Sequence, residues 1–231
     1  TCHGIWDTPD EYKNKYMQEG RSEGFATLLG MLEFMDDETG RLLDYLTENG
    51  LDENTVVLFL SDNGPIQMNE TNAEWELRNN HGFLGNKARL WQNGLKSPLF
   101  VRWKGKYQPA NVERLVTVTD IFPTILDIAD IPVPENNLPL DGRSFKTYLE
   151  GDTTTLNEKS AVFSHWFPVR EEGQFSPLQP HNKAALDFEE QRITLINERY
   201  KLLYNPVNVN GSPEKFEEKV LIDLQEDPLE S

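Results

Sequence analysis

The amino-acid sequence predicts an α/β fold followed by a small α+β subdomain with an antiparallel sheet. A helical pattern of apolar residues precedes an apolar, β-branched strand, and a second strand and a second helix follow. This alternation of helices and strands is typical of α/β domains. Beyond residue 152 the sequence changes to short strand candidates separated by polar loops that contain proline. Such a pattern indicates a separate antiparallel sheet.

The first helix is predicted from Thr27 to Asn49. Its apolar residues recur at the helical period and are Leu28, Leu32, Met35, Leu42 and Leu46. Gly50 follows directly and is expected to end the helix, because glycine readily adopts the left-handed conformation of a C-cap. Gly40 inside the pattern costs about 1 kcal/mol relative to alanine, which a packed apolar face can offset.

Two strands and a second helix are predicted next. The run from Thr55 to Leu60 is continuous, apolar and β-branched, which is typical of a strand buried on both faces of a parallel sheet. Pro98 to Trp103 has a second strand-like pattern. Asp120 is a favourable N-cap for a helix from about Ile121 to Ala129. Pro123 falls within the first turn of this helix, where the missing N–H is harmless.

Four short strands are predicted in the C-terminal subdomain. They are Ser160 to His165, Ile193 to Ile196, Tyr200 to Tyr204 and Val220 to Leu224. The linker that precedes them is expected around Glu150 to Leu156. The predicted domains are therefore residues 1–151, the α/β part, and residues 152–231, the small subdomain.

The composition restricts the classes of function that the chain can have. With 22 basic and 39 acidic residues the net charge is −17, and such a surface repels nucleic acid and anionic membranes. Cys2 is the only cysteine, so this chain can form neither an internal disulfide nor a zinc site built from cysteines. No run of about 18 apolar residues is present, and no membrane span is expected. An acidic surface suits a secreted protein, and we expect a periplasmic or extracellular location.

The first predicted strand ends in Ser61, Asp62, Asn63 and Gly64, which is explained either by a turn or by a binding site. Asn-Gly is a strong hairpin signal, but a hairpin requires an alternating strand after Pro65, and the residues that follow are polar and do not alternate. In α/β sheets ligands lie beyond the carboxyl ends of strands. A carboxylate beside an amide oxygen suits calcium or magnesium. The pattern favours a cation site at Asp62 and Asn63.

A second candidate segment runs from His81 to Pro98. Gly85 and Gly94 flank Lys87, whose ammonium group is suited to contact an anionic oxygen. Taken alone, a solvated loop lysine is the commoner explanation. His81, directly ahead of the loop, is either a substrate contact or an ordinary polar loop residue.

Together these segments resemble the type I sulfatase family of the alkaline-phosphatase-like superfamily. The family's strand ending Ser/Thr-Asp-Asn-Gly is matched by Ser61 to Gly64. Its loop Gly-x-Lys-x-x-x-aromatic-Glu-Gly-Gly-x-Arg-x-Pro is matched at Gly85, Lys87, Trp91, Gly94 and Pro98. The segments TCHGIWDTPDEY, VTVTDIFPTILDIADI, LDGRSFKTYLEG and LIDLQEDPLE are similar to other family segments. The resemblance covers almost the whole chain, and its specificity comes from the order and spacing of the pieces.

The resemblance implies an alkaline-phosphatase-like sheet with flanking helices, of which this chain would be the C-terminal part, and a calcium-dependent, arylsulfatase-like sulfuric ester hydrolase. Asp62 and Asn63 would be two ligands of Ca²⁺, with Mg²⁺ as the alternative metal. Lys87 would bind a sulfate oxygen and stabilise the transition state. His3 matches the histidine that contacts the ester and protonates the leaving alcohol. The expected catalytic residues are thus Lys87 and His3, and the expected substrate-binding residues are His81 and Lys87.

The sequence also departs from the family pattern. The family's nucleophile, formylglycine, matures from Cys or Ser in a Cys-x-Pro-Ser-Arg motif, whereas Cys2 is followed here by His-Gly-Ile-Trp. Two protein oxygens are too few for calcium, which takes about 6 to 8 ligands. In the loop, Gln92, Asn93 and Lys96 replace the usual Glu, Gly and Arg. We therefore expect formylglycine and further ligands in an N-terminal half of the same enzyme, and we expect this chain alone to be inactive.

The substrate and two alternative functions remain open at this point. The expected partner is a sulfate ester, and the polar loop from Gln67 to Asn80 would suit a sulfated oligosaccharide or polysaccharide. A phosphoesterase of the same superfamily would instead use metal to activate Thr or Ser. A non-catalytic module would bind a sulfated glycan through the small subdomain, where His165 and His181 lie and are expected to be structural.

Overall fold

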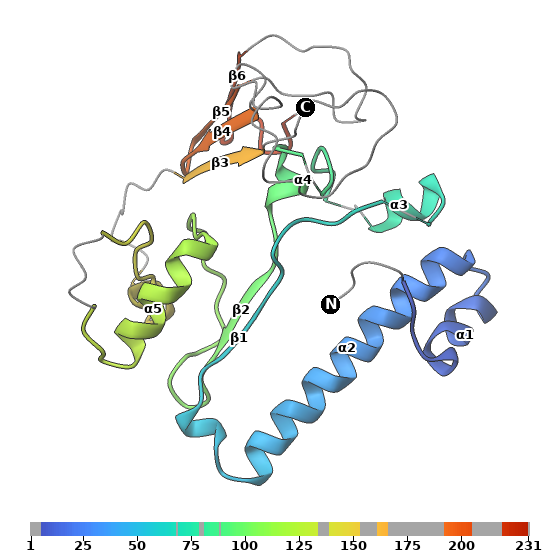
Figure 1. Ribbon diagram of the computed structural model, residues 1–231, viewed down its shortest axis with the longest axis horizontal. Helices are drawn as coiled ribbons and strands as arrows, with labels where there is room; N and C mark the ends of the chain where they lie inside the picture. The colour runs from blue at the N-terminus through green and yellow to red at the C-terminus, as the bar shows by residue number, and fades with distance from the viewer. Residues whose placement is uncertain are drawn as a thin grey trace, which may run out of the picture. The chain divides into compact units, whose positions relative to one another are not determined.

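The computed structural model (Figure 1) describes residues 6–67, 69–78, 81–87, 89–133, 139–152, 161–165, 192–204 and 219–230. The chain forms two compact units whose segments alternate along the sequence. Unit 1 comprises Thr1–Ser61, Pro65–Gly82 and Pro98–Pro109, and unit 2 comprises Asp62–Gly64, Phe83–Ser97 and Ala110–Ser231. The boundary expected near residue 152 stays a prediction. Of the helices in the described ranges, none is long and apolar enough to cross a bilayer.

Unit 1 begins with two helices that pack against each other, α1 (Asp10–Gln18) and α2 (Glu23–Glu48). The hydroxyl of Ser22 caps α2 by accepting a hydrogen bond from the amide of Phe25 at 3.3 Å. Gly50 has a φ of +67°, the left-handed conformation in which glycine follows a helix end. The helix predicted from Thr27 is confirmed, and it begins about one turn earlier.

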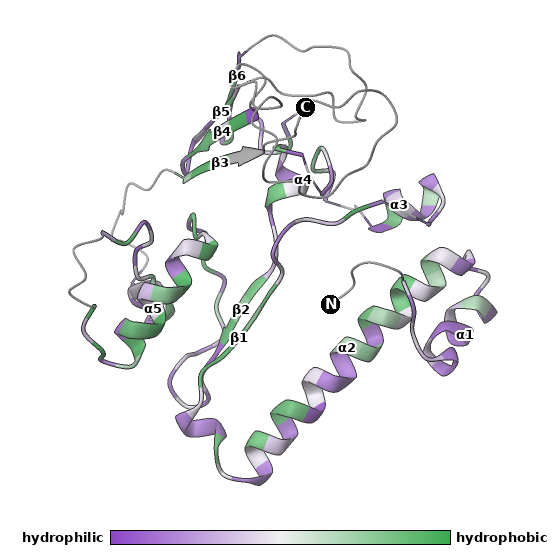
Figure 2. Cartoon of the chain, in the orientation of Figure 1, coloured by the Kyte–Doolittle hydropathy of each residue, from purple (hydrophilic) through white to green (hydrophobic). Residues whose placement is uncertain are grey.

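The apolar face of α2 is buried in its first part and again at Leu46 near its C-terminal end, but not between them. Phe25, Ala26 and Leu28 are buried, whereas Leu32 and Leu42 are 39% and 52% exposed. Figure 2 shows that apolar residues continue along the helix toward its C-terminal end. The helical period is a local property of the sequence, but burial needs a partner surface. Within the described part of unit 1, α1 supplies that surface only for the first turns of α2.

The strands β1 (Val57–Leu60) and β2 (Leu99–Arg102) form a two-stranded sheet, and a 3-10 turn, η1 (Asp52–Asn54), precedes β1. The strands pair antiparallel, with Leu60 opposite Leu99. The expectation of a parallel strand buried on both faces is wrong for the described residues, because Leu60 is 40% exposed. An apolar, β-branched run specifies a strand but carries no information about the direction of its partner. The amide of Ser61 donates to the carbonyl of Pro98 at 3.2 Å, which extends the pairing by one residue beyond the strands.

The helix α3 (Asn72–Arg78) is held in unit 1 by the buried carboxylate of Glu74. This carboxylate accepts hydrogen bonds from the amide and hydroxyl of Ser22, at 2.8 and 2.6 Å, and from the amide and hydroxyl of Thr71, at 2.9 and 2.8 Å. Burial alone would raise the pKa of Glu74, but these hydrogen bonds outweigh burial and lower the pKa from 4.5 to about 2. Glu74 therefore joins the N-cap of α2 to the start of α3.

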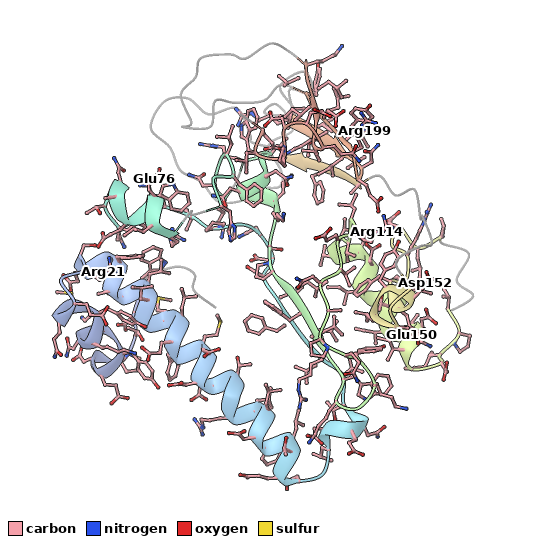
Figure 3. The ribbon with its side chains drawn as sticks, turned by 180° about the vertical axis from the view of Figure 1, so that it is seen from behind. Arg21, Glu76, Arg114, Glu150, Asp152 and Arg199 are labelled. Carbon is pink, nitrogen blue, oxygen red and sulfur yellow. The ribbon has the colours of Figure 1, made fainter. Side chains whose placement is uncertain are left out.

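We expect Glu74→Gln to remove a contribution to the free energy of unfolding that the wild-type protein loses at low pH. Because the folded pKa lies below the unfolded value, the carboxylate contributes fully above about pH 4.5, and this contribution, on the order of 3 kcal/mol, is lost as the pH falls toward about 2. Urea unfolding at a series of pH values should show a shallower loss of stability in the variant. Glu76→Gln, an exposed change on the same helix (Figure 3), is the control. Equal pH slopes for wild type and Glu74→Gln would contradict this expectation.

Unit 2 contains a four-stranded antiparallel sheet whose strands lie side by side in the order of the chain. Its strands are β3 (Ala161–His165), β4 (Arg192–Ile196), β5 (Tyr200–Tyr204) and β6 (Lys219–Asp223). All four predicted strands are confirmed. Arg199, just before β5, pairs with Asp223 at 2.9 Å (Figure 3). The buried face of the sheet carries Leu203 and Ile222, which pack against Leu90 and Trp91.

The predicted second helix is confirmed as α5 (Ile121–Ile128), which directly follows a 3-10 turn, η2 (Val118–Asp120). Asp120 occupies the N-cap position of α5, as predicted, but its side chain makes no cap hydrogen bond to that helix. Its carboxylate instead accepts hydrogen bonds from the amides of Thr117 and Arg143, at 2.7 and 2.8 Å. Thr117 is the N-cap of η2, in a reciprocal capping box with Asp120. The hydrogen bond from Arg143 attaches the segment before α6 (Lys146–Leu149) to Asp120 at the start of α5.

Candidate functional site

The Asp62–Gly64 turn and the lysine loop, defined as residues 83–97, lie together in unit 2. The amide of Gly64 donates to the carbonyl of Gly94 at 3.0 Å. A Cβ atom on Gly64 would lie 1.8 Å from the carbonyl oxygen of Asn93, so only glycine permits this approach of two backbones. The structure thus joins the two segments that the sequence singles out as a cation site and an anion site.

The lysine loop is closed by contacts on both sides of Lys87. The amide of Asn93 donates to the carbonyl of Leu84, and its side-chain Nδ2 donates to the carbonyl of Gly85, both at 2.9 Å. Trp91 is 4% exposed and belongs to the core formed with the four-stranded sheet. Lys87 is half-buried in the turn between these anchors. The loop is therefore a fixed support for the ammonium group.

The two predicted metal ligands occupy a turn with an oriented amide. Asp62 is exposed and Asn63 is half-buried. The Nδ2 atom of Asn63 donates to the carbonyl of Gly64 at 2.9 Å, which places the side-chain oxygen on the opposite edge of the amide. A carboxylate and an amide oxygen fit a hard cation such as Ca²⁺. In the part of the chain that the structure describes, no cluster of three or more His, Cys, Asp or Glu side chains forms a complete metal site.

None of the predicted histidines belongs to the Asp62–Gly64 turn or to the lysine loop. His81 is exposed and belongs to unit 1, whereas Lys87 belongs to unit 2. His3 and His181 lie outside the described residues. His165 is the last residue of β3. The polar loop from Gln67 to Asn80 contains α3, whose Glu74 and Arg78 make structural contacts within unit 1.

A further support of the lysine loop, Glu230, was missed by sequence reasoning. Its Oε2 atom accepts a hydrogen bond from the amide of Gln92, the first residue of α4 (Gln92–Leu95), at 2.7 Å. Its Oε1 atom accepts one from Nζ of Lys201 at 2.5 Å, and both side chains are fully buried. The sequence of β5 pointed to a buried acidic residue of this kind, because the two-residue period of a strand places Lys201 on the same face as the buried Leu203. A lysine on an apolar face requires an acidic partner.

Two family models match the chain. The model described as Sulfatase matches residues 1–131, and the model described as N-sulphoglucosamine sulphohydrolase, C-terminal, matches residues 79–231. The chain is 30% identical over 217 residues to a protein named Uncharacterized sulfatase YdeN from Escherichia coli (strain K12), covering 87% of this chain and 37% of the relative. It is 26% identical over 195 residues to an N-acetylgalactosamine-6-O-sulfatase from Bacteroides thetaiotaomicron. This match covers 79% of this chain and 36% of that relative. The chain thus spans a little over a third of the length of these relatives.

Solved structures show the same fold. Ps i-CgsB in complex with k-i-k-neocarrahexaose has a TM-score of 0.72 at 19% identity, covering 99% of this chain and 43% of that chain. The phosphonate monoester hydrolase SpPMH from Silicibacter pomeroyi matches with a TM-score of 0.54 at 19% identity. This match covers 89% of this chain and 36% of the hydrolase chain. These similarities confirm the predicted fold class, an alkaline-phosphatase-like α/β architecture followed by a small antiparallel sheet.

Proposed function

Because the chain belongs to the sulfatase family, we propose that it supplies the metal-binding turn and the lysine loop of a sulfuric ester hydrolase. The observation that carries the proposal is the hydrogen bond from Gly64 to Gly94 at 3.0 Å. It attaches the turn with two oxygen ligands to the loop with the ammonium group. A sulfate ester needs both, because negative charge on its oxygens is stabilised by a bound cation and by a positioned donor.

The proposed roles follow from the charges and atoms of these residues. Asp62 and Asn63 would hold Ca²⁺, or Mg²⁺ as the alternative, and the bound metal would supply positive charge to a sulfate oxygen. Lys87 would donate hydrogen bonds to the sulfate and stabilise the charge that develops on it. His3 would protonate the leaving alcohol oxygen, since imidazole exchanges protons near neutral pH. His81 would contact the substrate.

The remaining components are proposed to lie outside this chain. The nucleophile would be a formylglycine in an N-terminal half of the same enzyme, because Cys2 has no Cys-x-Pro-Ser-Arg context. The apolar residues left exposed on β2 and α2, such as Phe100 at 64% and Leu42 at 52%, suit coverage by that half. With a net charge of −17, the protein would attract an anionic substrate only where cations such as Lys87 and the metal reverse the local field.

The substrate is proposed to be a sulfated oligosaccharide. The B. thetaiotaomicron relative is named for a sulfated amino sugar, and one structural neighbour is described with D-glucosamine-2-N,6-O-disulfate as its substrate. A periplasmic or extracellular location would suit both this class of substrate and the acidic surface. The loop from Gln67 to Asn80 is a candidate sugar contact through its exposed polar residues.

A phosphoesterase is the second candidate function. It is favoured by two structural neighbours that are phosphonate monoester hydrolases, with TM-scores of 0.54 and 0.55. The lysine loop and the sulfatase family model favour the sulfatase. A third candidate, a non-catalytic module that binds a sulfated glycan, is motivated by the absence of the nucleophile motif from this chain.

The proposal is tested with the longer protein to which we assign this chain. Its upstream region should encode Cys-x-Pro-Ser-Arg or the corresponding Ser motif. Inorganic sulfate released from a panel of sulfated mono- and oligosaccharides should be measured for the longer protein and for residues 1–231 alone. Hydrolysis is expected from the longer protein only. Turnover by the isolated chain, or glycan binding without hydrolysis by the longer protein, would contradict the proposal.

A further inference from the structure

We propose that Glu230 and Lys201 are positioning residues for Lys87, acting as a buried ion pair that fixes the start of α4 and, through it, the lysine loop. The identification of Lys87 as the sulfate-binding residue rests on the proposed function. The contacts that hold the loop do not depend on it.

The carboxylate of Glu230 has a separate partner for each oxygen. Oε2 accepts from the amide of Gln92 at 2.7 Å, and Oε1 accepts from Nζ of Lys201 at 2.5 Å. The backbone of Glu230 has a φ of +63°, a left-handed conformation that favours glycine over other residues. Since glycine would relieve this strain but has no carboxylate, the contacts of the side chain explain why glutamate occupies the position.

The burial of the Lys201 ammonium group also lowers the stability of the sheet. Lys201 lies in a cross-strand row with Ala161, Ile196 and Ile222, all of which are buried. A buried ammonium must be paired, and replacing such a pair by apolar residues is often neutral or stabilising. Burial lowers the pKa of Lys201, and its attraction to Glu230 opposes this change. Stability alone does not account for the pair, whereas the orientation of the Glu230 carboxylate toward Gln92 does.

The segment from Gln92 to Gly94 transmits this constraint to the site. Asn93 donates to the carbonyls of Leu84 and Gly85, which precede Lys87. Gly94 accepts from the amide of Gly64, in the turn that carries the metal ligands. A displacement of Gln92 therefore changes the position of Lys87 relative to this turn.

Hydrogen–deuterium exchange of peptides from the lysine loop tests the inference in the longer protein. Glu230→Gln should increase exchange across residues 84–97 by about tenfold, because a charged acceptor is replaced by a neutral one beside a buried ammonium. It should also lower kcat for a sulfate ester by about tenfold, with a smaller change in KM. Glu226→Gln, an exposed change in the same tail, is the matched control and should alter neither.

The double variant Lys201→Met with Glu230→Leu separates positioning from stability. It removes both buried charges, so its Tm should return toward the wild-type value. Its loop should still exchange faster and its kcat should stay low, because the amide of Gln92 has lost the carboxylate. Recovery of Tm, exchange and kcat together would overturn the inference, as would unchanged exchange in Glu230→Gln. Faster loop exchange in variants of a protein without sulfatase activity would support the positioning role and refute the proposed function instead.

Discussion

Replacing Lys87 by alanine in the longer protein is expected to lower kcat for a sulfate ester by about 10²- to 10³-fold, the range observed when one preorganised donor to a developing charge is removed. Lys87 is half-buried in a loop whose backbone is fixed at Leu84 and Gly85. The backbone that carries the ammonium group therefore needs little rearrangement when substrate binds. Initial rates with an aryl sulfate over a range of substrate concentrations measure this effect.

The lysine loop provides its own control for this substitution. Lys96 is exposed, and its Nζ atom lies 4.5 Å from the centre of the Phe83 ring. Lys96→Ala removes one positive charge from the same loop, so the net charge of the protein changes equally in both variants. We expect a small effect of Lys96→Ala. If the two variants lose activity equally, or if Lys87→Ala keeps full activity, Lys87 is not the sulfate-binding residue.

Replacing Gly64 by alanine is expected to separate the Asp62–Gly64 turn from the lysine loop. The new Cβ would lie 1.8 Å from the carbonyl oxygen of Asn93 and 3.0 Å from the carbonyl carbon of Gly94. Both are backbone atoms, so no side-chain rotation relieves the clash and the hydrogen bond to Gly94 must break. We expect a loss of roughly 3 kcal/mol in the free energy of unfolding and at least about a 100-fold loss of kcat, because displacement of catalytic groups by about 1 Å has this effect.

Gly40→Ala is the control for this second substitution. Gly40 lies within α2, and a Cβ atom there would meet nothing within 4 Å. Alanine should stabilise the helix by about 1 kcal/mol through its higher helical propensity. Denaturant unfolding of the two variants should therefore shift in opposite directions. A Gly64→Ala variant as stable and active as wild type would show that the two backbones are not in contact.

Local patterns predicted the parts of the fold that depend on short stretches of sequence. The helical period identified α2, with its end near Gly50, and strand propensity identified all four strands of the small sheet. The pairing of β1 with β2 was not predictable in the same way. Continuous apolar residues specify a strand, whereas the antiparallel direction depends on how the chain returns at Leu99.

The candidate site was predictable to the extent that each segment carries its own motif. Asp62, Asn63 and Lys87 follow from residue types and spacing together with the family resemblance. The link between Gln92 and Glu230 joins residues 138 positions apart, and no local period encodes such a contact. A lysine at position 201, on the buried face of an apolar strand, pointed to an acidic partner but did not identify it.

We propose that the Asp62–Gly64 turn and the lysine loop form part of a single, metal-dependent site for sulfate esters. The most direct measurement compares kcat/KM of the longer protein for an aryl sulfate and the matching aryl phosphate, before and after removal of metal by a chelator. We predict that the sulfate is the preferred substrate, that the chelator abolishes its hydrolysis, and that added Ca²⁺ restores it. Preference for the phosphate, or sulfate hydrolysis that persists without metal, would contradict the claim.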